Sequence, residues 1–400
     1  GGGATELYSV NPEGGYLSIK STFSNATSGN GTVVLGHNSG NGSTGSGCVF
    51  IGQNVNASGG GHYAVAIGHK AAKDGITNYR IAIGDKAAEV STSGERAIAI
   101  GREAGRTAQA GDTIAIGYQA GYVSQGLDSV AIGVTAGKNY QGAHSVAIGD
   151  MAGEGSNSSS HQGDYSVAVG PEAGRTNQSN YATAVGNMAG NSGQGQQSVA
   201  VGHWAGWNNQ GNSCVAIGQD SGVYSQGTHC VAIGKGAGYQ NQPTNCIAIG
   251  REAGISSQGA ESIAIGGYSN AKGGNKATCI GFSAGRCLSG SVGEYGLCLG
   301  ASAGMYGCPN RTIIINATGG DLPPNNTTFN EDAFYVKPIR SDTNTHKLLY
   351  NTTTGEITYQ EDSGGGGGAS ALLGPNSDSF TSSNADQNHA ATNSVILGTD

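Results

Sequence analysis

The chain has 400 residues, of which 73 are glycine, 6% are aromatic and 12% are charged, and its formal net charge is −8. Few large side chains are therefore available for the thick apolar core of an ordinary globular protein. The negative charge and the lack of a Lys/Arg run argue against nucleic acid as a partner. No run of about eighteen apolar residues is present, so we expect no membrane insertion by this segment.

Residues 1–30 are expected to form an N-terminal linker and entry segment. The sequence starts with "GGGATELYSV", which has neither an initiator Met nor a signal-peptide pattern. We therefore expect the chain to be a piece of a longer protein.

Residues 31–308 contain a tandem repeat marked by the glycine that closes each "AIG" motif. Twelve of the sixteen steps between successive repeat glycines are sixteen residues long. Such a short and strict period predicts a solenoid in which each repeat is one coil. Positions are counted below from this repeat glycine, so −2 lies two residues before it and +8 eight residues after it. The repeat glycines are Gly36, Gly52, Gly68, Gly84, Gly101, Gly117, Gly133, Gly149, Gly170, Gly186, Gly202, Gly218, Gly234, Gly250, Gly266, Gly281 and Gly300.

Each coil contains a short β-branched run such as IAIG, VAIG or VAVG, which predicts a strand between glycine-rich turns. Strand alternation sends Val or Ile at −3 and −1 to one face and the small residues at −4 and −2 to the other. Strands without charge on either face are usually covered on both. The coil's own second half can supply one cover. We expect the small-residue face, including Ala131 and Ala200, to meet the backbone of an identical subunit.

Two residue types recur at fixed positions of the coil. Glutamines at +8 would stack in register as a hydrogen-bonded ladder, or would form an exposed polar stripe that touches a ligand. They are Gln109, Gln125, Gln141, Gln178, Gln194, Gln210, Gln226, Gln242 and Gln258. Cysteines at −4, namely Cys214, Cys230 and Cys246, should form a column with Cα atoms about 4.8 Å apart in adjacent coils. Small buried thiols, disulfides and a metal site are the three interpretations of these cysteines and of Cys279 and Cys298 at −2.

The last part of the chain changes character. Residues 309–362 have alternating strand patterns and a turn at "NTTTGE", which predicts a β connector or neck. Residues 363–369 form a glycine-rich linker by composition. Residues 370–400 end in "NSVILGTD" and resemble the start of a second head-like module.

The "SVAIGxxA" core resembles the head repeats of trimeric autotransporter adhesins, over about residues 31–304. This resemblance implies an all-β protein: a left-handed parallel β-roll, here with about sixteen residues per coil instead of the family's fourteen, assembled as a homotrimer. The longer "AIGxxAGxxxQG" variant resembles repeats in fibre proteins of large DNA viruses and phages. It implies an extracellular location, on a virion or cell surface.

Aromatic residues gather in or near the variable turns, where they could stack on sugar rings or merely shield the edges of the coils. The receptor-contact candidates are Tyr118, Tyr122, Tyr140, Trp204, Trp207, Tyr224 and Tyr239.

The sequence offers no constellation typical of catalysis. There is no Cys-x-x-Cys motif and the nine His residues lack ligand spacing, so we expect no metal, no cofactor and no catalytic residue. Glu103, Glu172 and Glu252 at +2 are interpreted as solvated turn residues. The leading hypothesis is an adhesive fibre module that gives multivalent attachment to a host glycan or protein receptor. A purely structural extracellular filament and a polysaccharide-degrading tailspike are the alternatives.

Overall fold

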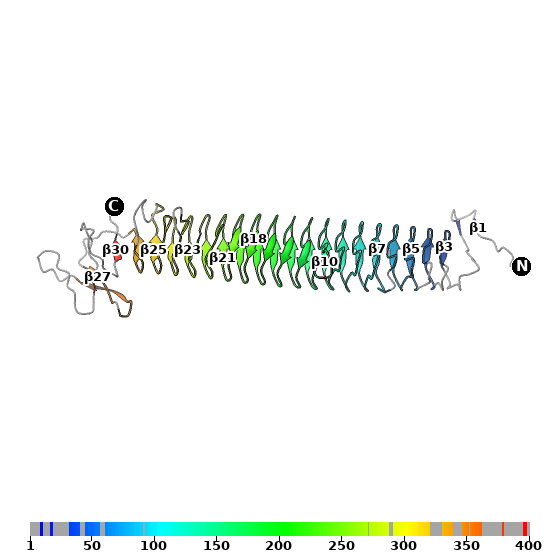
Figure 1. The fold of residues 1–400 in the computed structure, drawn as a ribbon, viewed down its shortest axis with the longest axis horizontal. Coiled ribbons are helices and arrows are strands. Elements are labelled where there is room, and N and C mark those ends of the chain that lie inside the picture. The colour runs from blue at the N-terminus through cyan, green and yellow to red at the C-terminus, as the bar shows by residue number, and fades with distance from the viewer. Residues whose placement is uncertain are drawn as a thin grey trace. The chain divides into compact units, whose positions relative to one another are not determined.

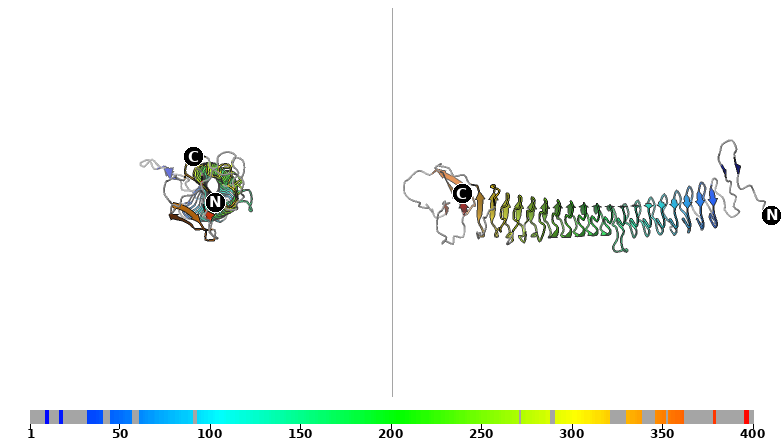
Figure 2. Two further views of the ribbon diagram at one scale, coloured as in Figure 1. Left: turned by 90° about the vertical axis from the view of Figure 1, so that its left-hand side faces the viewer. Right: turned by 90° about the horizontal axis from the view of Figure 1, so that it is seen from above.

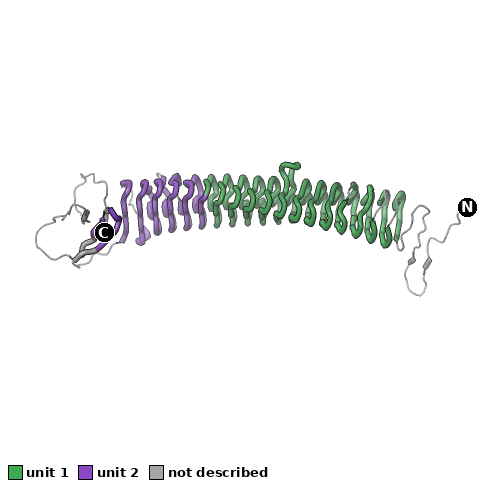
Figure 3. Tube along the Cα trace, turned by 90° about the horizontal axis from the view of Figure 1, so that it is seen from below, with its two compact units in different colours: residues 1–244 green, residues 245–400 purple. Residues whose placement is uncertain are grey.

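The computed structural model describes residues 9–10, 17–18, 32–40, 45–56, 61–90, 93–270, 272–287, 291–320, 330–338, 346–351, 353–361, 378–379 and 395–397. The chain divides into two compact units, Gly1–Thr244 and Asn245–Asp400, which Figure 3 shows in different colours. None of the domain boundaries predicted from the sequence falls at this division. Each unit is described by itself below.

The first unit is a parallel β-solenoid in which each coil contributes one strand to a long parallel sheet (Figure 1). Neighbouring strands pair in register, so that Ala131 lies beside Ala115 on one side and Ala147 on the other. The strands are β3 (Val33–Leu35), β4 (Val49–Ile51), β5 (Val65–Ile67), β6 (Ile81–Ile83), β7 (Ile98–Ile100), β8 (Ile114–Ile116), β9 (Val130–Ile132), β10 (Val146–Ile148), β11 (Val167–Val169), β13 (Thr183–Val185), β15 (Val199–Val201), β17 (Val215–Ile217) and β19 (Val231–Ile233).

Each coil has two opposite walls, of which the strands above form the first. Toward the end of the first unit, the second halves of the coils form the second wall, which is a parallel sheet of its own. Its strands are β12 (Thr176–Gln178), β14 (Ser192–Gln194), β16 (Asn208–Gln210), β18 (Tyr224–Gln226) and β20 (Gln240–Gln242). A longer turn around Asn157 and Ser160 leaves the coils between β10 and β11, where the sequence has its largest irregularity (Figure 2). Near the N-terminus, β1 (Ser9–Val10) pairs antiparallel with β2 (Leu17–Ser18).

The second unit repeats the solenoid pattern and extends it beyond the predicted end at residue 308. Its parallel strands are β21 (Ile247–Ile249), β22 (Ile263–Ile265), β23 (Thr278–Ile280), β24 (Leu297–Leu299), β25 (Ile313–Asn316) and β26 (Phe334–Lys337). Strands β25 and β26, within the predicted connector, pair in register with the strands before them. Asn316 and Lys337 stand where earlier coils have the repeat glycine, so a search for that glycine misses both coils.

The rest of the second unit contains a hairpin and two short strands. Strands β27 (His346–Tyr350) and β28 (Ile357–Glu361) pair antiparallel around the predicted "NTTTGE" turn. Strand β29 (Asp378–Ser379) pairs with β27. Strand β30 (Val395–Leu397), in the segment predicted to start a second module, pairs parallel with β26. The described residues contain no helix, and the predicted parallel β-solenoid of about sixteen residues per coil is confirmed.

The repeat glycine is required by the stacking distance between coils. Gly133 has a φ of +133°, and a Cβ atom there would lie 2.4 Å from the carbonyl oxygen of Gly149 in the next coil. That oxygen belongs to the backbone and cannot turn away. A side chain at this position would therefore force the coils apart, which explains why glycine recurs there.

The small-residue face lines the inside of each coil, which corrects the prediction that it meets another subunit. Ala131 and Ala200 are both fully buried within a single chain. The Cβ of Ala131 and the side chain of Gln141 both approach Gly137, so the coil's own second half covers this face. Val and Ile at −3 and −1 point outward instead, and Ile148 and Ile217 are 37% and 38% exposed. We call this outward row the Val/Ile face.

Glutamine side chains bridge the two walls inside the coils. All nine glutamines at +8 are buried. In the coil of Gly133, the Nε2 of Gln141 donates to the carbonyl oxygen of Val130, at 2.8 Å. The same eleven-residue link recurs from Gln109, Gln125, Gln178, Gln194, Gln210, Gln226, Gln242 and Gln258.

Stacking in register also brings some of the amides together. Nε2 of Gln109 donates to Oε1 of Gln125 at 3.2 Å, and Gln178 donates likewise to Gln194 at 3.0 Å. The pair Gln226 and Gln242 does the same at 3.1 Å. The glutamines are therefore interior braces, and none forms the exposed polar stripe that was the alternative interpretation.

The buried cysteines and one buried arginine complete the interior. Cys214 and Cys230 precede paired strands, and the backbone N–H of Cys230 donates to Sγ of Cys214 at 3.4 Å. Cys246 occupies the same −4 position before β21 in the second unit and is also buried, and its Sγ donates to the carbonyl oxygen of Gly259 at 3.0 Å. Arg80 takes the −4 position of its coil. Its guanidinium donates to the oxygens of Ser93 and Gln109, and burial lowers its pKa to about 10.

Candidate functional site

A continuous row of aromatic rings crosses three successive coils near the end of the first unit. His203 stacks on Trp204 with ring centroids 5.0 Å apart, and Trp204 stacks on Trp207 at 6.0 Å. Trp207 then meets Tyr224 edge to face at 5.5 Å, and Tyr224 meets Tyr239 in the same way at 5.6 Å. We call these five residues the aromatic ridge. Four of them were receptor-contact candidates from the sequence, and His203 was not.

The rings of the aromatic ridge are exposed or, at Trp207 and Tyr239, half-buried, and they hold one another in place. Trp204 and Tyr224 are 37% and 36% exposed. The backbone of Trp204 is left-handed, with φ of +57°, and its indole Nε1 donates to Sδ of Met188 at 2.9 Å. Rings that are fixed before binding lose little conformational freedom when a ligand arrives. The aromatic ridge therefore presents a rigid, amphipathic surface.

The phenol of Tyr239 is neutral at ordinary pH. Burial raises the pKa of Tyr239, and the neighbouring Tyr224 and Asp220 raise it further. A neutral phenol can donate and accept a hydrogen bond. The tyrosine end of the ridge therefore offers hydroxyl groups as well as ring faces.

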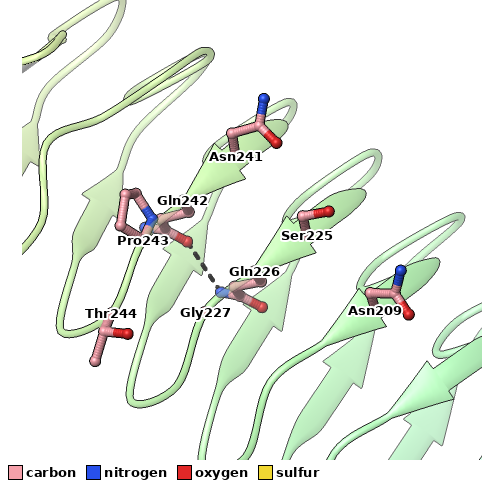
Figure 4. Close-up of a pocket in the computed structure, with 8 residues that line it drawn as sticks. All are labelled: Asn209, Ser225, Gln226, Gly227, Asn241, Gln242, Pro243 and Thr244. Atoms are coloured by element: carbon pink, nitrogen blue, oxygen red, sulfur yellow. Dashed lines mark hydrogen bonds between the residues drawn. The ribbon is translucent and has the colours of Figure 1, made fainter.

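A row of short polar side chains runs beside the tyrosine end. Asn209, Ser225 and Asn241 occupy the +7 position of the same three coils, with left-handed φ of +55°, +51° and +49°. Figure 4 shows the three side chains pointing to the same side from successive strands β16, β18 and β20. All three residues are exposed. We call them the polar row.

Two shallow hollows connect the polar row with the aromatic ridge. The first, of about 410 Å³, is lined by the polar row together with Gln226, Gly227, Gln242, Pro243 and Thr244 (Figure 4). Its floor is fixed by backbone bonds such as that from the N–H of Gly227 to the carbonyl oxygen of Gln242, at 2.7 Å. The second hollow, of about 400 Å³, is lined by Tyr224, Tyr239, Gln240 and Asn241. Asn241 lines both hollows, so amide, hydroxyl and ring groups meet there.

The remaining three receptor-contact candidates lie outside the aromatic ridge. Tyr118 packs under the guanidinium of Arg102, 5.6 Å from the ring centroid. The hydroxyl of Tyr122 accepts a hydrogen bond from Nη1 of Arg106 at 2.5 Å. Tyr140 is 39% exposed at the +7 position of its coil. The structure thus brings together four of the seven candidates and leaves these three apart.

Sequence reasoning missed a second set of aromatic residues at position −5. Tyr63 stacks on Tyr79 at 5.4 Å. Farther along, His144 stacks on Tyr165 at 4.7 Å, and Tyr165 stacks on Tyr181 at 5.2 Å. Their common signal is a ring five residues before the repeat glycine, two residues ahead of the strand. These stacks lie beside the Val/Ile face and are separate in sequence position from the aromatic ridge.

Two of the glutamates at +2 are not the solvated turn residues that the sequence predicted. Glu103 is only 7% exposed, and its side chain accepts a hydrogen bond from Nε2 of Gln119 at 2.8 Å. This bond and the nearby Arg106 and Lys86 lower the pKa of Glu103. Glu103 is therefore a packed, paired group. Glu172 is half-buried and is bound by Arg175 at 3.1 Å.

Neither metal-ligand clusters nor membrane-crossing helices occur in the described residues. No group of three or more His, Cys, Asp or Glu side chains there has the arrangement needed to hold a metal ion. In the same residues, no helix has the length and apolar character needed to cross a membrane. Comparison of the chain with protein-family models, with curated proteins and with solved structures finds no match.

Proposed function

We propose that this chain is a structural and adhesive fibre module, displayed on a virion or cell surface, which assembles as a homotrimer and attaches to host-surface glycans. The observation that carries the proposal is the aromatic ridge with its polar row, held rigidly on a solenoid. The proposal has two parts, assembly and attachment, and each has its own test.

Assembly is supported by the Val/Ile face. Parallel sheets normally have both faces covered, because their strands are apolar on both sides. Here the inner face is covered by the coil's own second half, while half-exposed Val and Ile, replaced only by Leu35 and Thr183, continue along β3–β11, β13, β15, β17 and β19. Contiguous apolar surface of this kind is typical of protein interfaces. Because nearly every coil presents the same row, a second copy of the chain is the best-fitting partner. The number three comes from the resemblance to trimeric adhesin heads.

Assembly can be tested with charges on the Val/Ile face. Replacing Ile116, Ile132 and Ile148 together with aspartate should convert a trimer into separate chains, measured by native mass spectrometry. The matched control is Val134→Asp, since Val134 is 48% exposed but lies at +1, just beyond the strand. Far-UV circular dichroism checks that both variants keep their β structure. A trimeric triple variant, or a parent that is a lone chain, would contradict the assembly proposal.

Attachment to glycans is supported by the chemistry of the ridge. Sugar rings have apolar C–H faces that stack on Trp and Tyr rings, and hydroxyl groups that pair with amides and phenols. The aromatic ridge and the polar row supply both kinds of contact side by side. The hollows are shallow, so each site alone would bind weakly. Three copies in one assembly would raise the overall avidity without any new contact.

A glycan array with the assembled protein tests attachment. Trp204→Ala and Trp207→Ala should each reduce binding about five- to thirtyfold, because a ring stacked in a contact contributes on the order of 1–2 kcal/mol at an interface. Tyr118→Ala is the control, since it removes an exposed aromatic ring outside the ridge. Equal binding by parent and ridge variants would contradict the assignment of the glycan site to the aromatic ridge, and a parent that binds no glycan would favour the purely structural filament. Shortening of a bound polysaccharide would favour the tailspike alternative.

A further inference from the structure

Four cysteines are buried together inside the coils of the second unit. Cys279 and Cys298 occupy position −2 of paired strands, where most coils have alanine. Cys287 and Cys308 lie in the second halves of these coils. All four belong to one buried cluster and are at most 5% exposed.

Cys308 occupies the +8 position, which glutamine holds in the earlier coils. In the coil of Gly250, the Nε2 of Gln258 reaches across to the carbonyl oxygen of Ile247 at 2.9 Å and ties the two walls together. The coil of Gly300 has no glutamine at +8. Cys298 and Cys308 face each other across its interior, at the place where a glutamine amide links the two walls of the earlier coils. A sulfur-to-sulfur bond there would replace the missing brace.

The side chains of Cys298 and Cys308 converge on Gly304. A Cβ atom placed on Gly304 would lie 2.6 Å from Sγ of Cys298 and 3.4 Å from Cβ of Cys308. Gly304 has no side chain to separate them. The thiols of Cys279 and Cys308 both interact with that of Cys298, and with burial they raise its pKa well above the usual value. In the folded chain this thiol is therefore neutral, so its chemistry belongs to folding, when it is still exposed.

We propose that Cys298 and Cys308 form a disulfide bond across the interior of this coil during folding in an oxidising environment. The thiolate of one cysteine attacks a low-molecular-weight disulfide such as oxidised glutathione, forming a mixed disulfide and releasing one glutathione thiolate. The second cysteine's thiolate then attacks the protein sulfur of that mixed disulfide and releases the second glutathione. The two cysteines lose two protons and two electrons, which convert one molecule of oxidised glutathione into two reduced molecules.

The partner of Cys298 is Cys308 and not Cys279. Cys279 and Cys298 lie in register on parallel strands, so their side chains point the same way at the strand spacing of about 4.8 Å. A disulfide requires a Cβ separation of about 3.5–4.5 Å, with side chains that turn toward each other. Residues at −2 and +8 face each other across the coil, which satisfies the second requirement.

A peptide map of the full chain tests the bond directly. The protein is folded with oxidised glutathione, then unfolded, alkylated without reduction, and cut with trypsin and a protease specific for Glu. Cleavage at Arg286, Glu294 and Arg311 leaves Cys298 and Cys308 in one peptide, 295–311, while Cys279 and Cys287 fall in two others. We expect peptide 295–311 to be unalkylated and two hydrogens lighter, and to gain two alkyl groups after reduction. Free cysteines in this peptide, or a link to another peptide, would overturn the proposal.

Two variants sharpen the result. In Cys308→Ser, Cys298 should become alkylated without reduction, and added reductant should no longer lower the temperature of unfolding. Cys230→Ser is the matched control, because it removes a buried thiol of the first unit and should leave peptide 295–311 linked. If Cys308→Ser does not fold, the temperature of unfolding of the parent with and without reductant decides: it should be lower when reduced, and equal values would overturn the proposal.

Discussion

Replacing Gln178 with methionine tests whether the interior amides hold the coils together. Methionine has nearly the same length but cannot donate a hydrogen bond. Gln178 is 1% exposed, and its Nε2 donates to the carbonyl oxygens of Val167 at 2.9 Å and Ala182 at 3.3 Å. It also donates to Oε1 of Gln194 at 3.0 Å. All three contacts disappear in the variant.

The expected loss follows from these three contacts. A hydrogen bond inside a protein contributes about 0.5–1.5 kcal/mol net, so three give a loss of about 1.5–4.5 kcal/mol in the free energy of unfolding. The Nε2 group has two hydrogens for these three acceptors, so one hydrogen is shared and the lower half of the range applies. Volume changes little, so the packing cost should be small.

Guanidinium chloride unfolding followed by circular dichroism gives the measurement. The midpoint should fall while the slope with denaturant stays the same, because the surface exposed on unfolding is unchanged. Hydrogen exchange should rise first in the coils around Gln178, since each coil contacts only its neighbours. The control is Gln196→Met, the same substitution at an exposed position, which should change the free energy by less than about 0.5 kcal/mol. Equal midpoints for Gln178→Met and the control would refute the view that these amides brace the coils.

Three further outcomes are expected. Gly133→Ala should destabilise the fold severely, by about 3 kcal/mol or more, because the new Cβ would meet the carbonyl oxygen of Gly149; a melting temperature equal to the parent's would contradict the glycine argument. Ala131→Leu should lower the unfolding temperature of the single chain by overpacking the interior, at a cost of about 1–3 kcal/mol, and a variant that loses only its assembly would restore the interface interpretation. Because Gln119 and nearby cations lower the pKa of Glu103 in the folded state, its contribution to stability should be present above about pH 5 and be lost as the pH falls through that lowered value. Glu103→Gln should flatten this acid limb in thermal unfolding measured against pH.

The sequence by itself determined the period, the strands and the alternation of side chains. A glycine about every sixteen residues marks the coils, because a Cβ atom at this position, as at Gly133, would collide with the backbone of the next coil. This steric constraint acts on one position of the repeat, so it can be recognised from the sequence. Counting repeat glycines missed the coil of Ile313–Asn316, because Asn316 stands in the place of the repeat glycine. Composition also directed attention to the glutamines at +8, although it left their inward or outward direction open.

Only the tertiary structure decided which face of the strand is the interior. Both faces of the strand lack charge in most coils, so the alternation of side chains along the sequence does not indicate which face is buried. The path of the coil's second half covers the small side, where Ala131 and Gln141 fit within one narrow interior, and leaves Val and Ile outside. The aromatic ridge likewise depends on the folded turns, because Trp204, Tyr224 and Tyr239 stand at different positions of their repeats. They form one row only because stacking at the coil spacing brings the turns of successive coils side by side.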